Sequence, residues 1–390
     1  MPKRSSEKGK ERVEVKAALV RWAIHRTGRG VQAFAPKFPH LEGWLRGESL
    51  PTLGQLEAFA KATYTPVGYL FLTEPPVEQI PIPDFRTMAG KRYPRPTPDL
   101  LDTIYICQQR QDWYRGFAQS IGERPLAFVG SVRTSEDIAE VATKIRGALG
   151  FDVSARRAMP TWTDALRHFI GQADAAGVMV MCSGVVMNNN RRKLDPEEFR
   201  GFAIADPLAP VVFINGADTK AAQMFTLAHE LAHIWLGESA VSDAQPDRVS
   251  NNEMERWCNS VAAEVLVPLD DLRSAYDPKN DIQSEARRLA RWFKVSTLVV
   301  LRRIHDVGGL TADQLWKEYE RELERLVSID KGSGGNFYLT QAARVSKRFA
   351  RALIASTREG RSSFTEAFRL LGVKKMETFR GFEDSLGMAM

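Results

Sequence analysis

The pattern of apolar and polar residues predicts a chain that is mainly helical, with one short region of strands. Apolar residues recur every three or four positions over several long stretches, as they do on the buried face of a helix. Near the middle of the chain the pattern changes to short apolar runs of the kind that form strands, at residues 177–187, 201–205 and 211–214. We therefore expect an α+β fold in which a small sheet lies among many helices.

Two helices are expected after the third apolar run. Residues 215–218 (Asn-Gly-Ala-Asp) are a turn signal, residues 221–236 are strongly apolar, and Gly237 is a stop signal. A second helix is expected over residues 252–267, because Pro268 ends it. A helix as apolar as the first is mostly buried, which suits a site at the floor of a cleft.

The first of these helices carries His229-Glu-Leu-Ala-His233, a complete HExxH motif. Residues four apart lie on one face of a helix, so both imidazoles can reach a single metal ion. The carboxylate of Glu230 lies nearby, where it can take a proton from a water molecule at the metal. The alternative is two ordinary helix histidines beside a surface glutamate, and the apolar flanks disfavour it.

A catalytic zinc ion normally has a third protein ligand and an open fourth position. No histidine follows His233 until His305, so we expect an acidic third ligand. The acidic candidates downstream of the motif are Glu238, Asp243, Asp247, Glu253, Glu255 and Glu264. Glu255 is favoured because Asn259 shares its helix face and could orient a histidine, with Glu264 and Glu253 as its rivals.

The two helices resemble those of the ImmA/IrrE family of zinc metalloendopeptidases. The resemblance lies in Phe225-Thr-Leu-Ala-His-Glu-Leu-Ala-His233 of the first helix and in the segment from Glu255-Arg-Trp-Cys-Asn to Pro268 of the second. The resemblance implies a zincin-like core with a gluzincin-like ligand set. In that set His229, His233 and Glu255 bind Zn²⁺ and Glu230 is the catalytic base. Cys258, Val261 and Val267 replace the alanine, phenylalanine and methionine that are usual in the family. These are packing positions, so the chemistry is unaffected.

The resemblance also implies a substrate class. Members of the family typically cleave one specific protein partner, a helix-turn-helix repressor or an antitoxin, in stress, mobile-element or toxin–antitoxin regulation. The alternative is a DNA- or protein-binding transcriptional regulator or antitoxin whose zinc site is structural or latent. Glu230 favours the peptidase, since a structural site has no need of a base.

The N-terminal residues 1–74 are expected to form a separate unit. The segment from Trp44 through Gly47 and Pro51 resembles the end of the helix-turn-helix in phage-repressor-like domains. Between Ala35 and Trp44 about four residues are missing, at the turn and the start of the recognition helix. We expect a shortened helix-turn-helix-like domain that either contacts DNA or docks the substrate or an antitoxin partner.

Three further segments are expected: a proline-rich connector at 75–98, the zinc metallopeptidase domain at 99–330, and a basic helical segment at 331–390. The last segment carries apolar residues at helical spacing, so it should pack against the rest of the protein.

Charge, hydropathy and cysteine content limit the binding partners and the cellular compartment that we expect. The net charge of +6 allows contact with nucleic acid without requiring it. We find neither an apolar run long enough to span a membrane nor a secretory signal. Cys107, Cys182 and Cys258 are odd in number and widely spaced, which predicts free thiols and a cytoplasmic protein.

Overall fold

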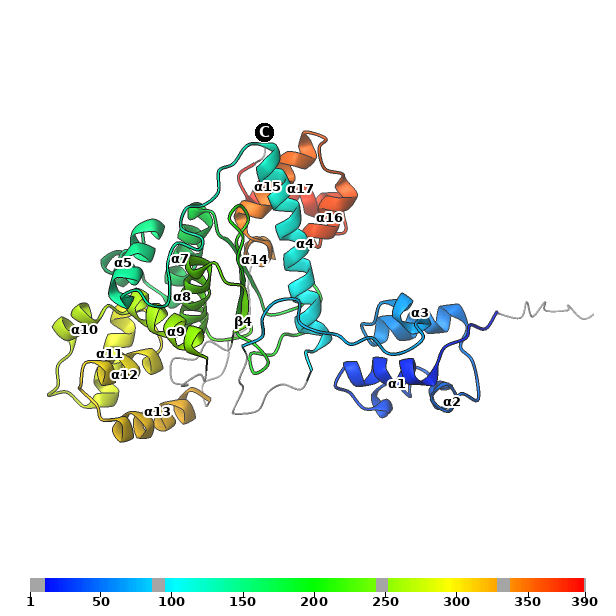
Figure 1. Ribbon diagram of the computed structural model, residues 1–390, viewed down its shortest axis with the longest axis horizontal. Coiled ribbons are helices and arrows are strands. Elements are labelled where there is room, and N and C mark those ends of the chain that lie inside the picture. The colour runs from blue at the N-terminus through cyan, green and yellow to red at the C-terminus, as the bar shows by residue number, and fades with distance from the viewer. Residues whose placement is uncertain (1–10, 86–94, 243–251, 328–336, 389–390) are drawn as a thin grey trace, which may run out of the picture. The chain divides into compact units, whose positions relative to one another are not determined.

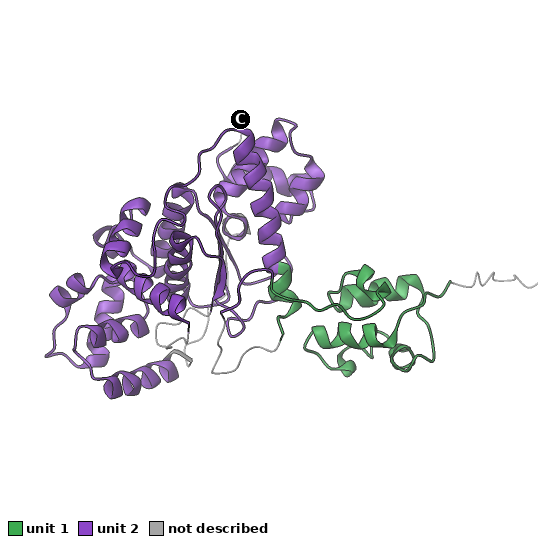
Figure 2. Cartoon of the chain, in the orientation of Figure 1, with its two compact units in different colours: residues 1–80, 94–102 green, residues 81–93, 103–390 purple. Residues whose placement is uncertain are grey.

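The computed structural model describes residues 11–85, 95–242, 252–327 and 337–388. These residues form two compact units (Figure 2). The first contains the described residues of 1–80 and 94–102, and the second those of 81–93 and 103–390.

The first unit is helical. It contains α1 (Ala17–Arg26), the 3₁₀ turn η1 (Val31–Ala33), α2 (Leu41–Arg46), α3 (Leu53–Ala62) and the 3₁₀ turn η2 (Val67–Phe71). A capping box starts α3, since the side chains of Thr52 and Gln55 each accept a hydrogen bond from the backbone of the other. Its own apolar core includes Leu19, Trp44 and Phe59. In the region where the sequence is shorter than a helix-turn-helix motif, α2 has only 6 residues.

The second unit is built on a four-stranded mixed sheet. Its strands are β1 (Met179–Ser183), β2 (Gly201–Ile204), β3 (Val211–Asn215) and β4 (Ala240–Ser242), in the order β1-β3-β2-β4. β1 is parallel to β3, whereas β2 is antiparallel to both β3 and β4. The α+β class and the three strands expected from the sequence are confirmed. β4 was not predicted, because three residues are too few to show a period.

Helices surround this sheet (Figure 1). Before and between the strands lie α4 (Pro98–Ser120), α5 (Ile138–Leu149), α6 (Val153–Arg157), α7 (Trp162–Ala176) and α8 (Lys220–Leu236). After β4 come α9 (Glu253–Leu266), α10 (Leu269–Ala275), α11 (Ile282–Phe293), α12 (Thr297–Asp306) and α13 (Ala312–Val327). The C-terminal helices are α14 (Phe337–Val345), α15 (Lys347–Arg358), α16 (Phe364–Leu371) and α17 (Met376–Ser385). Of α4, residues 98–102 belong to the first unit.

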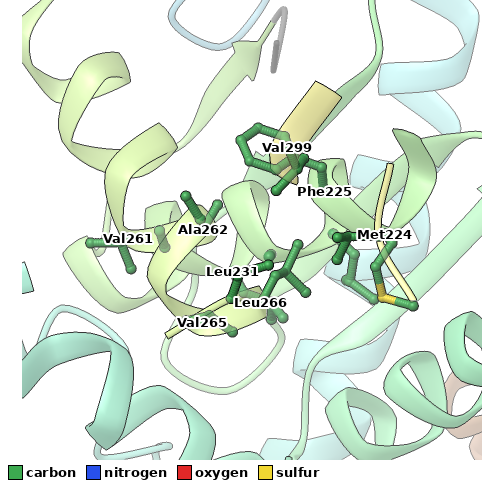
Figure 3. Packing of buried hydrophobic residues seen from close by; sticks show 14 of the residues in the cluster. Met224, Phe225, Leu231, Val261, Ala262, Val265, Leu266 and Val299 are labelled. Carbon is green, nitrogen blue, oxygen red and sulfur yellow. The ribbon is translucent and has the colours of Figure 1, made fainter. Parts of the chain in front are cut away.

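The centre of the second unit is the packing of α8 against α9. The side chain of Thr219 caps the start of α8, and Gly237 ends it in the left-handed conformation at φ 76°. From Gln223 to Trp235 every residue of α8 is buried. Figure 3 shows Leu231 of α8 with Leu266 of α9 in this apolar core. The central part of the helix is therefore buried on all sides, so its polar residues lie in the protein interior.

The C-terminal helices pack against the same unit, as the spacing of their apolar residues predicted. The buried guanidinium of Arg110 in α4 donates to the backbone carbonyls of Leu370, at 3.0 Å, and Arg344, at 3.1 Å. The carboxylate of Asp174 in α7 accepts a hydrogen bond from the hydroxyl of Ser346 at 2.8 Å. Across the four described ranges, no helix is both long and apolar enough to cross a bilayer.

Candidate metal centre

α8 and α9 bring the side chains of His229, His233 and Glu255 together in the interior. The two Nε2 atoms of the histidines lie 3.2 Å apart. The carboxylate of Glu255 reaches both, with Oε2 at 3.3 Å from Nε2 of His229 and Oε1 at 3.0 Å from Nε2 of His233. Both histidines are fully buried and Glu255 is 3% exposed. Each residue thus points one potential ligand atom at a common centre.

The spacing of these three atoms fits a metal ion. Two ligand atoms at the usual bond length from a tetrahedral zinc ion lie about 3.3 Å from each other. Nδ1 of His229 lies 3.0 Å from the side-chain oxygen of Asn259, which can only accept a hydrogen bond. Nδ1 therefore carries the proton, and Nε2 presents its lone pair to the centre. The donor set and its tautomer suit metal binding.

The electrostatics of the centre favour the forms of its residues that bind a metal. Burial alone would raise the pKa of Glu255, but its interactions with His229 and His233 lower it to about 2. Burial lowers the pKa of His233, which keeps its imidazole neutral. A carboxylate and neutral imidazoles are the protonation states that metal ions require.

Glu230 lies next to this set on α8 and is fully buried. Burial raises the pKa of Glu230 well above its usual value, and the charge of Glu255 raises it further, while the nearby hydroxyl of Ser242 lowers it. A raised pKa means that a carboxylate binds a proton more tightly than an ordinary glutamate does. Glu230 is therefore suited to act as a base.

Two residues at the centre were missed by the sequence analysis. Ser242 on β4 has its hydroxyl oxygen 3.4 Å from Nε2 of His233. Gly201 on β2 lies against α8, where a Cβ atom would be 2.6 Å from Cγ2 of Thr226 and 2.9 Å from Oε1 of Glu230. No pattern in the sequence pointed to Ser242, because β4 is too short to be predicted. Gly201 had appeared only as the start of a strand.

The other acidic candidates lie elsewhere. Glu264 forms an ion pair with Arg303 and also accepts a hydrogen bond from the backbone N–H of Leu269 at 3.3 Å. Glu238 and Glu253 are exposed. Asp243 and Asp247 lie outside the described residues. Of the acidic candidates within the described ranges, it is Glu255 that lies with the two histidines.

Comparison with known families gives two matches. Residues 173–305 match a peptidase family model described as the IrrE N-terminal-like domain. This segment contains β1 to β4, α8 and α9, and with them every residue of the centre. Residues 345–385, which contain α15, α16 and α17, match a domain of unknown function (DUF8813). No curated protein matches the chain.

Proposed function

We propose that this protein is a zinc-dependent endopeptidase that cleaves a specific protein partner, because residues 173–305 match the model of a peptidase family described as the IrrE N-terminal-like domain. The observation that carries the proposal is the buried Glu230 beside the His-His-Glu set. A metal ion that only holds a fold together has no need of a further buried carboxyl group next to its ligands. A peptidase needs one to accept a proton from water.

In this proposal the residues of the centre have different roles. His229, His233 and Glu255 would hold the zinc ion, and Asn259 fixes the ring of His229 through its Nδ1–H. When bound, zinc polarises the scissile carbonyl and makes a nearby water more acidic. The carboxylate of Glu230 takes a proton from that water and later passes it to the nitrogen of the leaving amine.

The partner that we propose is a DNA-binding repressor or antitoxin with a helix-turn-helix fold, cleaved in stress, mobile-element or toxin–antitoxin regulation. The resemblance of the chain to the ImmA/IrrE family supports this class. The first unit, whose sequence resembles a shortened helix-turn-helix, would dock the substrate. The free thiols of Cys107, Cys182 and Cys258 suit an enzyme that acts in the reducing cytoplasm.

The protease assignment is tested by comparing cells that produce the wild-type protein with cells that produce Glu230→Gln. New protein N-termini, identified by mass spectrometry, should appear with the wild type in one or a few proteins and be absent with Glu230→Gln. Glu238→Gln changes an exposed glutamate near the end of the same helix and should behave as the wild type. Identical sets of N-termini in all three would overturn the assignment.

DNA contact by the first unit is a separate question. If its basic side chains bind phosphates, the band shift of a DNA duplex should weaken steeply as salt rises. An affinity that is independent of salt, or no shift at all, would exclude such contact.

A further inference from the structure

β4 is the last strand of the sheet, and its outer edge pairs with residues 83–85 of the same chain. Asp84 forms a parallel bridge with Val241. The backbone N–H of Phe85 donates to the carbonyl of Val241 at 3.0 Å, and the N–H of Val241 donates to the carbonyl of Pro83 at 2.9 Å. Residues 83–85, which we call the strap, belong to the same compact unit as β4.

The edge that the strap covers lies beside the candidate metal centre. Ser242, the last residue of β4, contacts His233 through its hydroxyl. Gly201, the partner of Ser242 on β2, lies against Glu230. A polypeptide that pairs with the outer edge of β4 therefore lies beside the strand whose Ser242 contacts His233, and two strands from Gly201. Exposed sheet edges are common binding sites for extended peptides, which add a strand through backbone hydrogen bonds.

Pro83 limits the hydrogen bonds that the strap can form with β4. In a strand the N–H and C=O of one residue point to the same side, and the carbonyl of Pro83 points to β4. The nitrogen of Pro83 therefore also faces β4, but it has no hydrogen to donate. Val241 exchanges two hydrogen bonds with the strap, and Pro83 cannot add another. A longer strand without proline could form more bonds with the same edge.

We propose that the strap occupies the edge at which an extended segment of the substrate protein pairs for cleavage. The strap must leave β4 before this segment can bind, so the pairing is an autoinhibitory contact. The inference rests on the proposed peptidase function. Beyond that function, the inference assigns the binding site of the substrate to the edge of β4 and its bound conformation to an extended strand. It also names the strap as the competitor of the substrate.

The test uses the full, zinc-loaded chain with Glu230→Gln, so that a bound chain is not cut. Phe85→Pro removes the N–H that bonds to Val241, whereas Phe85→Ala removes the ring and keeps the N–H. The probe is fluorescein-labelled casein, an unfolded protein, and binding is followed by fluorescence anisotropy. Loss of one typical backbone hydrogen bond should strengthen casein binding about fivefold in Phe85→Pro. Phe85→Ala should bind casein as the parent does.

Hydrogen exchange shows where casein binds. The amide of Val241 should exchange faster in Phe85→Pro than in the parent, and saturating casein should protect residues 240–242 again. In the parent, excess casein should speed exchange in the strap while β4 stays protected, which tests the inference without relying on a variant. Unchanged exchange at Val241 in Phe85→Pro would overturn the proposal. Casein binding that leaves the amides of residues 240–242 unprotected would also overturn it. A Phe85→Pro variant that binds casein no more tightly than the parent would do the same.

A failure of the proposed function is distinguishable from a failure of this inference. Binding and exchange in the Glu230→Gln background do not require catalysis. Absence of Glu230-dependent cleavage in cells would reject the peptidase, whatever the strap does.

Discussion

At Gly201 the backbone of β2 passes so close to α8 that a side chain has no space. We predict that Gly201→Ala reduces cleavage by pushing Glu230 away from its position, and that it destabilises the protein by about 1–3 kcal/mol. Gly147, inside α5, has open space around its Cα, so Gly147→Ala should stabilise the protein by up to about 1 kcal/mol and leave cleavage intact. Denaturant unfolding and cleavage assays on both variants check this. Full activity in Gly201→Ala would contradict it.

Asn259 should contribute to metal affinity without touching the metal. Its oxygen accepts the Nδ1 proton of His229, so Asn259→Ala leaves that ring free to turn and to change tautomer. We expect a loss of about 10–100-fold in zinc affinity, measured by competition with a chromophoric chelator. Ser260→Ala, one residue along α9, removes only a hydrogen bond to the backbone carbonyl of Arg256 and should change the affinity little. Equal affinities in the two variants would argue against this role.

Some residues of the centre could be named from the sequence and others could not. His229, Glu230 and His233 follow one another in a motif, and Glu255 was favoured by helix spacing and by the resemblance. Gly201 lies close to Glu230 only because β2 packs on α8. That proximity depends on tertiary packing, which one sequence does not reveal.

At the scale of elements, the two helices of the centre were predicted to within a residue or so of their ends. Residues 221–236 and 252–267 were expected, and Lys220–Leu236 and Glu253–Leu266 are observed. Their ends carry strong local signals, such as Gly237 after α8. β4 and the strap are held by pairing with other segments, so local sequence could not predict them.

The carboxylate of Glu285 in α11 holds the segment that precedes this helix through hydrogen bonds. The stability of the protein should therefore depend on the protonation of Glu285. Hydrogen bonds from Arg288, and others from the backbone of Asp277 and the side chain of Asn280, lower the pKa of Glu285 from 4.5 to about 2. The stabilisation is therefore complete above about pH 4.5 and is lost as the pH falls toward 2.

We predict that Glu285→Gln is less stable than the wild type at neutral pH, and that the difference shrinks as the pH falls from 4.5 toward 2. Urea unfolding at a series of pH values measures it. Glu253→Gln, at an exposed position, is the control and should follow the wild type. A difference that stays constant over this range would show that the charge of Glu285 is not the cause.

At the scale of the whole molecule, the two compact units have separate apolar cores. The centre lies entirely in the second unit. If the two units unfold independently, a ligand stabilises only the unit that binds it, by about 2.7 kcal/mol at a hundredfold excess over its dissociation constant. Calorimetry should therefore show two unfolding transitions, of which zinc raises only one. A single transition, or equal shifts of both, would contradict independent units.

The most direct test of the central claim is the metal content of the purified protein, determined by elemental analysis. The wild type should hold about one zinc ion per chain, Glu255→Ala should lose it, and Glu230→Gln should keep it, because we propose that Glu255 is a ligand and that Glu230 is a base. A wild type without zinc even after reconstitution, or a Glu255→Ala variant that retains it, would contradict the account.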